Sequence, residues 1–407
     1  MLSKDGDSTA SDRNKASLTA TKKFIYNVES LTFPEQQLYN DYLCEVFLTN
    51  LDVTNWTLSK NFFEMVAAKG AYTRSLKMNY AIGISIQSLE IFRSLQMVNV
   101  VHMRGTIVVD VEVARIMSAW TRIYELDVSE CTIGPKAFST LLTRLTMLKT
   151  LYCEKCRGID DFSMQAIANC VQKHRKLTRL YMSQNSHFSD EGILAVLTAG
   201  STLLKDVDLS GSTSITSLAM AGLRQRMSNL STLNISNIRN LGQSVYEWLS
   251  EGCLFVTELN LHKSTSLDDP GLVAISRRLR HLRTFIMSSC LNISDEGITG
   301  FCSNFEGSLT SLDISGCVKC GGPSALALSG ICEKFKTLKV NCLSQVPAEG
   351  VRAIWMRLPE IEVFEMCADL RRYVWVWCSL SFALSTLIVV CVCASLCGAV
   401  LARIAAA

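Results

Sequence analysis

Apolar residues recur along the chain in one short motif, L-x-x-L-x-L, in which other aliphatic residues can replace leucine. Clear copies start at Ile123, Leu148, Leu177, Leu204, Leu230, Val256, Leu282 and Leu309, two more at Phe335 and Ile361, and weaker ones at Leu48, Thr73 and Leu95. From Leu177 onward, the steps between successive starts are almost identical. So constant a period indicates about thirteen stacked repeats.

Each unit combines two periodicities. In residues 309–317 the first, fourth and sixth residues are apolar and the ninth is cysteine, which predicts a short strand with one buried face and then a turn. Apolar residues at helical spacing follow, as in residues 192–198. Ser189 and Ser294, each followed by Asp-Glu, precede such segments and suit the start of a helix. The pattern therefore predicts an α/β solenoid in which strands and helices alternate.

These features resemble the cysteine-containing class of leucine-rich repeats, known from F-box substrate receptors and related to the ribonuclease-inhibitor type. The match covers residues 120–367 well and residues 48–119 poorly. The resemblance implies a horseshoe with parallel strands on the concave face and helices on the convex face. The family's ninth-position cysteine matches Cys131, Cys156, Cys290 and Cys317, and its second cysteine, near the end of the helix, matches Cys170, Cys253, Cys302 and Cys332.

In such a horseshoe the third and fifth residues of each unit point outward into the concavity, because side chains alternate along a strand. Tyr152 and Tyr181 occupy fifth positions in consecutive units and should be neighbours. Exposed tyrosine and arginine beside charged residues are typical of protein interfaces, although the same residues could equally be solvated strand positions. The candidate partner site comprises Glu125, Asp127, Tyr152, Arg179, Tyr181, Asp206 and Asp208.

The C-terminal region has a different character. Residues 374–402 contain no charged side chain, and about 20 apolar residues suffice to span a bilayer, so we expect a transmembrane helix followed by a short tail, 403–407. Residues 369–373 form a basic linker. Arg371, Arg372, Trp375 and Trp377 lie where headgroup anchors are expected, and the arginine pair favours a repeat domain facing the cytosol. Small residues such as Ala394 and Gly398 suit helix pairing in a homodimer, although no pairing is equally consistent.

The N-terminal region is less regular. Residues 1–23 are rich in Ser, Thr and charge and are expected to be disordered. Residues 24–70 are predicted to form an N-terminal cap with one degenerate repeat, before a solenoid over residues 71–368. Residues 31–50 faintly resemble the opening of an F-box, but the cap is the preferred interpretation.

Composition excludes several functions. Formal net charge is +3 and basic residues are scattered, so no nucleic-acid surface is indicated. The 17 cysteines are odd in number and many of them fall on inward repeat positions, which favours reduced, buried thiols. Cys320 is off the pattern and is a candidate exposed thiol. The two Cys-x-x-Cys pairs, Cys153/Cys156 and Cys317/Cys320, lie six repeats apart and cannot share a metal ion. The sequence predicts no enzyme activity and no metal or cofactor.

Together these features predict a membrane-anchored, single-pass scaffold or adaptor that binds a protein on its concave face. One alternative is the substrate-recognition subunit of a cullin-type ubiquitin ligase. Another is a surface receptor with extracellular repeats, for which glycosylation at Asn292 would be evidence.

Overall fold

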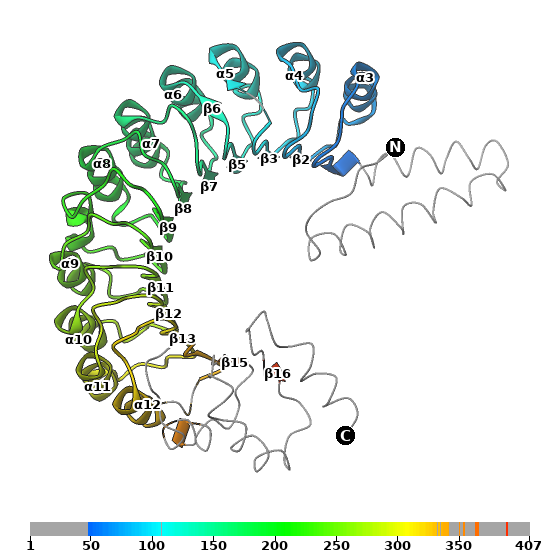
Figure 1. Ribbon diagram of the computed structural model, residues 1–407. Coiled ribbons are helices and arrows are strands. Elements are labelled where there is room, and N and C mark those ends of the chain that lie inside the picture. Colours follow the sequence, from blue (N-terminus) through cyan, green and yellow to red (C-terminus); the bar gives the residue numbers. More distant parts are fainter. Residues whose placement is uncertain are drawn as a thin grey trace, which may run out of the picture.

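The strands form a single continuous parallel sheet along the inner side of a horseshoe (Figure 1). The computed structural model describes residues 48–106, 108–331, 333, 335–341, 350, 353–354, 363–365 and 388–389. Within them the sheet has 14 strands, ordered along the chain: β1 (Asn50–Asp52), β2 (Ser75–Lys77), β3 (Val100–His102), β5 (Glu125–Asp127), β7 (Thr150–Tyr152), β8 (Arg179–Tyr181), β9 (Asp206–Asp208), β10 (Thr232–Asn234), β11 (Glu258–Asn260), β12 (Thr284–Ile286), β13 (Ser311–Asp313), β14 (Thr337–Lys339), β15 (Val363–Glu365) and β16 (Ile388–Val389).

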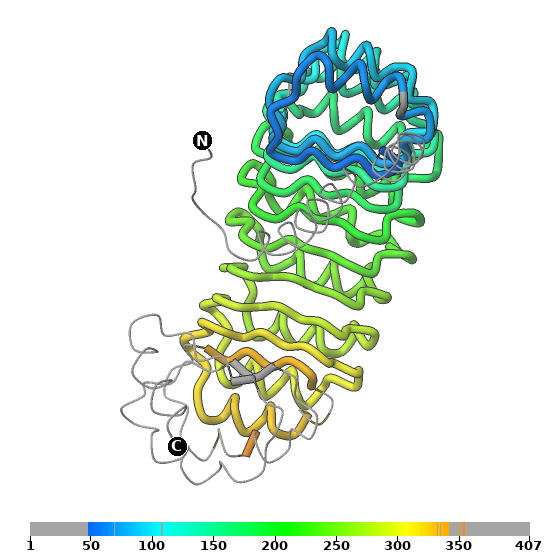
Figure 2. The backbone as a smooth tube through the Cα atoms, turned by 90° about the vertical axis from the view of Figure 1, so that its right-hand side faces the viewer, coloured from blue at the N-terminus to red at the C-terminus, as the bar shows by residue number. Residues whose placement is uncertain are grey.

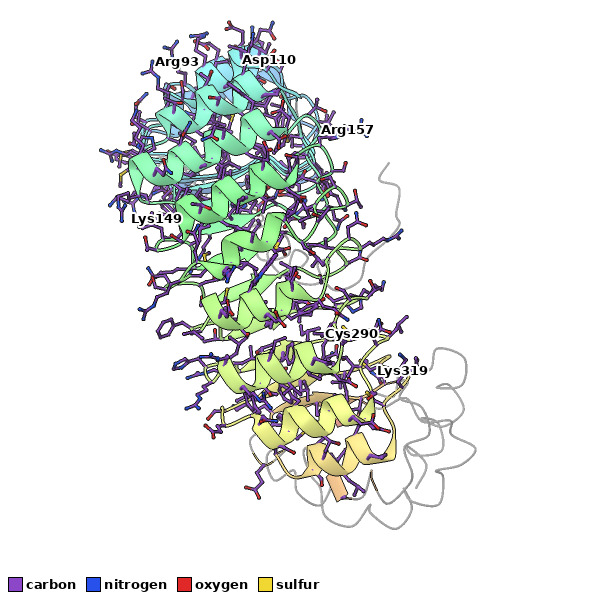
Figure 3. The ribbon with its side chains drawn as sticks, turned by 90° about the vertical axis from the view of Figure 1, so that its left-hand side faces the viewer. Arg93, Asp110, Lys149, Arg157, Cys290 and Lys319 are labelled. Carbon is purple, nitrogen blue, oxygen red and sulfur yellow. The ribbon has the colours of Figure 1, made fainter. Side chains whose placement is uncertain are left out.

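The helices lie on the outer, convex side, and Figure 3 shows this helical face directly. They are α3 (Lys60–Lys69), α4 (Ile86–Phe92), α5 (Val111–Met117), α6 (Pro135–Arg144), α7 (Asp161–His174), α8 (Asp190–Gly200), the 3-10 helix η2 (Ala219–Arg224), α9 (Ser244–Gly252), α10 (Asp269–Arg278), α11 (Asp295–Asn304) and α12 (Gly322–Ser329). A small second sheet pairs β4 (Val108–Val109) with β6 (Thr132–Ile133). The predicted α/β solenoid with a parallel sheet is confirmed.

The core runs the length of the solenoid between strands and helices. The fourth residue of each motif, such as Leu126, Leu151 or Leu180, is at most 1% exposed, while the residues on either side of it point to the opposite face of the sheet. Figure 2 shows the successive coils stacked side by side, so that each coil covers the apolar face of the next. A single coil lacks that cover, which is why stability depends on stacking.

A left-handed turn follows the strand in every well-described unit. The eighth residue has positive φ in eleven consecutive units: Asn55, Tyr80, Gly105, Glu130, Lys155, Gln184, Gly211, Asn237, Lys263, Ser289 and Gly316. Each of their backbone N–H groups donates to the carbonyl of the seventh residue in the next unit, at 2.7–2.9 Å. The conformation costs about 1–2 kcal/mol for a residue with a side chain, and this inter-unit hydrogen bond offsets part of it.

Cysteines at the ninth position point inward, as predicted. The thiols of Cys131, Cys156, Cys290 and Cys317 each donate to a backbone carbonyl of the preceding unit, at 3.1–3.3 Å. Burial raises the pKa of Cys253 and of Cys290 to about 12, so these thiols are protonated and unreactive at neutral pH. Cys320 is also fully buried, so the prediction that its thiol is exposed is wrong.

One unit starts at a different residue from the one predicted. The weak start at Leu95 is wrong, because the strand begins at Val100 and the unit therefore starts at Val98. Leu95 is buried, but it lies in the turn after α4 rather than in a strand. Val98 lies midway between the starts at Thr73 and Ile123, so the period itself gives the correct register.

Most of the predicted terminal segments lie outside the described residues. These are the disordered segment 1–23, most of the cap and the F-box-like segment, the linker 369–373, the tail, the anchors Arg371, Arg372, Trp375 and Trp377, and the pairing residues Ala394 and Gly398. Inside the predicted membrane helix, Ile388–Val389 are described, and they form strand β16 in parallel pairing with β15. The helix prediction is wrong for these two residues, because strand pairing requires extended backbone. Among the helices that the structure describes, none is both long and apolar enough to cross a bilayer.

Candidate interaction surface on the concave face

Two tyrosines stand together in the middle of the concave sheet. Tyr152 on β7 and Tyr181 on β8 are register partners, as predicted. Their rings are stacked, with centroids 4.6 Å apart and planes inclined by only 8°. Both side chains are half-buried, so each keeps part of its surface exposed. We call this pair the tyrosine stack.

The hydroxyls of the tyrosine stack are available to a partner. Neither accepts or donates a hydrogen bond among the described residues. Burial, followed by the negative charge of Glu125, raises the pKa of Tyr152 to about 12. Burial and the nearby Asp206 also raise the pKa of Tyr181. Both groups are therefore neutral at physiological pH and offer a hydrogen-bond donor as well as an acceptor.

On the N-terminal side of the stack, an aspartate lies beneath two rings. His102 on β3 and Tyr152 on β7 flank the strand that carries Asp127. Strands two apart are about 10 Å distant, yet the two ring centroids are only 6.2 Å apart, so the rings lean together over Asp127. The Asp127 side chain is consequently only 8% exposed, which corrects the expectation that it lies open on the surface.

His102 was not among the predicted site residues. Its Nε2 lies 2.8 Å from Oε1 of Glu125, and its ring meets that of Tyr152 at 72°. Sequence reasoning missed it because the unit was started at Leu95, which placed His102 outside a strand. The equal steps from Thr73 to Val98 and from Val98 to Ile123 are the signal that identifies it as a fifth-position residue.

On the C-terminal side, two carboxylates are held by polar contacts. The guanidinium of Arg179 forms an ion pair with Asp206, in which Nε lies 2.8 Å from Oδ2. Asp208 is the register partner of Tyr181. Its Oδ1 accepts the backbone N–H of Ser210 and its Oδ2 accepts the side-chain amide of Asn234, both at 2.8 Å. The predicted site residues are thus brought together on β5, β7, β8 and β9.

Part of the acidic character of this surface has a structural role. Asp127 and Asp208, like Asp313 further along, each accept the backbone N–H two residues later. This bond stabilises the turn that follows the strand. The second carboxylate oxygen of Asp127 accepts no hydrogen bond from the described residues.

The described residues contain no cluster of three or more His, Cys, Asp or Glu side chains that could hold a metal ion. Two hollows lie on the helical side, between α4 and α5 and between α6 and α7, with volumes of about 490 and 520 Å³. Neither includes a residue of the predicted site. The concave face is one continuous sheet along the inner side of the horseshoe (Figure 1), and so broad a surface suits a macromolecule better than a small substrate.

Comparison with known proteins agrees with the repeat fold. No family model matches the chain. It is 30% identical over 144 residues to the F-box protein MAX2 of Arabidopsis thaliana, covering 34% of this chain and 20% of that protein. It is 30% identical over 165 residues to pof2, an F-box protein of an SCF E3 ubiquitin ligase complex in Schizosaccharomyces pombe, covering 40% and 35%. The chain therefore spans between a fifth and about a third of the length of these relatives.

Solved structures show the same fold at lower sequence identity. The yeast complex of Rad7 and Elc1 includes a chain with a TM-score of 0.52 and 15% identity, and the match covers 95% of this chain and 98% of that one. An internalin of Listeria monocytogenes has a TM-score of 0.51 and 17% identity, with coverage of 77% and 86%. These likenesses support an α/β repeat solenoid with a parallel sheet, and over part of its length the chain is similar in sequence to F-box proteins.

Proposed function

We propose that this chain is an adaptor that holds a protein partner against its concave face and has no catalytic activity of its own. The observation that carries the proposal is the tyrosine stack, which lies half-buried in the middle of a largely polar strand surface. Tyrosine is enriched among the residues that dominate binding energy, since it combines a large rigid apolar area with a polar tip. Arg179, another residue type enriched in interfaces, stands beside Tyr181.

A co-purification experiment tests this proposal. The tagged full chain would be isolated in mild detergent, with and without the Tyr152→Ala/Tyr181→Ala double substitution. Hot-spot residues contribute about 2 kcal/mol or more, so we expect the double variant to lose the partner. Tyr124→Ala is the matched control, because Tyr124 is 38% exposed but contacts Lys149, whose Nζ lies 6.0 Å from its ring centroid. Lys149 lies at one edge of the helical face (Figure 3). Retention of every partner by the double variant would contradict the proposal.

A more specific role, as the substrate-recognition subunit of a cullin-type ubiquitin ligase, is supported by the two F-box relatives. One relative belongs by name to an SCF ubiquitin ligase complex, and the similar fold of Rad7 was solved together with Elc1. In this role residues 31–50 would bind the ligase adaptor and the concave face would bind the substrate. A ligase adaptor that co-purifies with the full chain, and is lost when residues 31–50 are deleted, is the expected result. A chain that retains this adaptor after the deletion would exclude residues 31–50 as its binding segment.

Attachment to a membrane, with the repeats facing the cytosol, stays a proposal that rests on the uncharged run at residues 374–402. A spanning helix would require the pairing of β16 with β15 to be broken. We expect the full chain to stay in the membrane pellet after alkaline carbonate extraction, and a chain without residues 374–407 to be released. Equal release of both would contradict the proposal, and a glycan on Asn292 would contradict the cytosolic orientation.

A further inference from the structure

The concave face has the opposite charge to the chain as a whole. At the third and fifth positions of β5 to β13 the strands carry six carboxylates (Glu125, Asp127, Asp206, Asp208, Glu258 and Asp313) and one guanidinium (Arg179). The full chain has a formal net charge of +3. Because Arg179 is already paired with Asp206, the remaining carboxylates leave this surface negative around the tyrosine stack. Phosphate-rich partners such as nucleic acids are repelled by a surface of this sign.

One outer ring face of the tyrosine stack, that of Tyr181, has no aromatic neighbour among the described residues. One face of Tyr152 is covered by Tyr181, and His102 leans against Tyr152 from the other side. Tyr181 has Tyr152 on one face, and no described aromatic ring covers the other. That open face looks toward β9, where Asp208 is the register partner of Tyr181. An electron-rich ring face therefore lies next to a fixed carboxylate.

A ring face next to a carboxylate favours the binding of a positively charged side chain. The face of an aromatic ring attracts a cation placed over it within about 6 Å. The two Asp208 oxygens each accept one hydrogen bond inside the protein, and a carboxylate has about four acceptor positions, so both oxygens can accept another. Asp127 and Glu125 add negative charge on the far side of the stack, each with one carboxylate oxygen that takes no hydrogen bond from the described residues.

We propose that the concave face recognises a basic segment of its protein partner, and that one arginine or lysine side chain of this segment lies over the open face of Tyr181 beside Asp208. The proposal rests on the adaptor function and specifies the chemistry of the partner. Tyr181 supplies the ring face, Tyr152 holds that ring upright by stacking, and Asp208 supplies the charge. The hydroxyls of the stack are free to hydrogen-bond the backbone of the same segment.

Fluorescence anisotropy on the purified full chain tests the recognition directly. The probes are a dye-labelled peptide of repeated Arg-Gly-Ser units and a matched peptide of Glu-Gly-Ser units. We expect the arginine peptide to bind, with an affinity that falls as salt is added, and the glutamate peptide not to bind. Binding of neither peptide, or of both equally, would overturn the proposal.

Substitutions then separate the ring from the hydroxyl. Tyr181→Leu removes the aromatic face and should weaken binding of the arginine peptide about tenfold, whereas Tyr181→Phe keeps the face and should change binding less than about twofold. Asp208→Asn keeps the shape and removes the charge, so it should also weaken binding. Equal losses in the phenylalanine and leucine variants would show that the hydroxyl, and not the ring face, is what matters.

The outcome is distinguishable from failure of the adaptor function. If Tyr152→Ala/Tyr181→Ala removes the co-purified partner while the arginine peptide does not bind, the concave site stands and its proposed preference for a basic segment is wrong. If the double variant keeps its partner, the concave site itself is wrong. Melting temperatures of all variants, compared with the unsubstituted chain, identify any variant that fails to fold.

Discussion

At the scale of single residues, the inward-pointing ninth position is occupied by different residue types in different units. Four cysteines donate their thiols to a carbonyl of the preceding unit. Asn185 makes three hydrogen bonds there, to the backbone N–H of Cys156 and to the carbonyls of Cys153 and Met182. Ser212 occupies the same position, fully buried, but its hydroxyl has no partner among the described residues.

The unpaired hydroxyl of Ser212 leads to a stability prediction. A buried polar group without a partner costs about 1–3 kcal/mol, and a thiol at this position can reach the carbonyl of the preceding unit through its longer C–S bond. We expect Ser212→Cys to raise the free energy of unfolding by about 1 kcal/mol, measured by urea denaturation. The reciprocal control, Cys317→Ser, should lower it. A lower free energy of unfolding in Ser212→Cys would show that the hydroxyl is satisfied by solvent.

At the scale of elements, several helices begin with an aspartate that hydrogen-bonds the next unit. Asp269, the first residue of α10, accepts the backbone N–H of Ser294 through Oδ1, at 2.9 Å. Asp295, the first residue of α11, accepts the backbone N–H groups of Gly321 and Ser324, at 2.8 and 3.0 Å. Asp295 therefore caps α12, which has no side-chain cap of its own. These aspartates therefore link neighbouring units by hydrogen bonds.

The carboxylate of Asp295 should give the solenoid a measurable acid sensitivity. Burial alone would raise the pKa of Asp295, but the hydrogen bonds from Ser324 and Gly321 outweigh burial and lower it below its ordinary value of 3.8. Because the folded pKa is the lower one, the stabilisation is complete above the unfolded value and is lost as pH falls through the folded value.

We therefore expect Asp295→Asn to reduce the free energy of unfolding at pH 7 by about 1–2 kcal/mol. At a second, acidic pH below the folded pKa of Asp295, the difference from the unsubstituted chain should shrink, because the protonated aspartate has lost its charge. Urea denaturation at the two pH values measures it. Glu191→Gln, at an exposed first-turn position without a hydrogen bond among the described residues, is the control and should have little effect at either pH. A difference that stays constant with pH would exclude a role for the charge.

These contacts also show where sequence reasoning works and where it stops. Ser294 caps its own helix, as predicted, by accepting the N–H of Glu296. Ser189 does not cap its helix, and its backbone N–H instead donates to Asp161 of the preceding unit. A motif within one unit is visible in the sequence, because its residues are neighbours. A contact between units depends on how two coils are stacked, and the pattern alone does not give that geometry.

At the scale of the whole molecule, the regular period was sufficient to predict the parallel sheet, the inward and outward columns, and the pairing of Tyr152 with Tyr181. It was insufficient for the burial of Asp127, because that depends on His102 and Tyr152 leaning together across a strand. The period is also interrupted once, since the step from Leu148 to Leu177 is longer than the steps on either side of it. The tyrosine stack joins the two strands separated by this longer step, whose unit contains the 14-residue helix α7.

The left-handed turn at the eighth position has a consequence for inherited variation. None of the eleven residues at this position is β-branched or proline, although the set otherwise ranges from glycine to tyrosine and lysine. Valine, isoleucine, threonine and proline are poorly compatible with positive φ. A missense change to one of these four residues at the eighth position of any repeat should therefore destabilise the fold, whatever partner the protein binds. An exchange of one polar residue for another at the same position should have little effect.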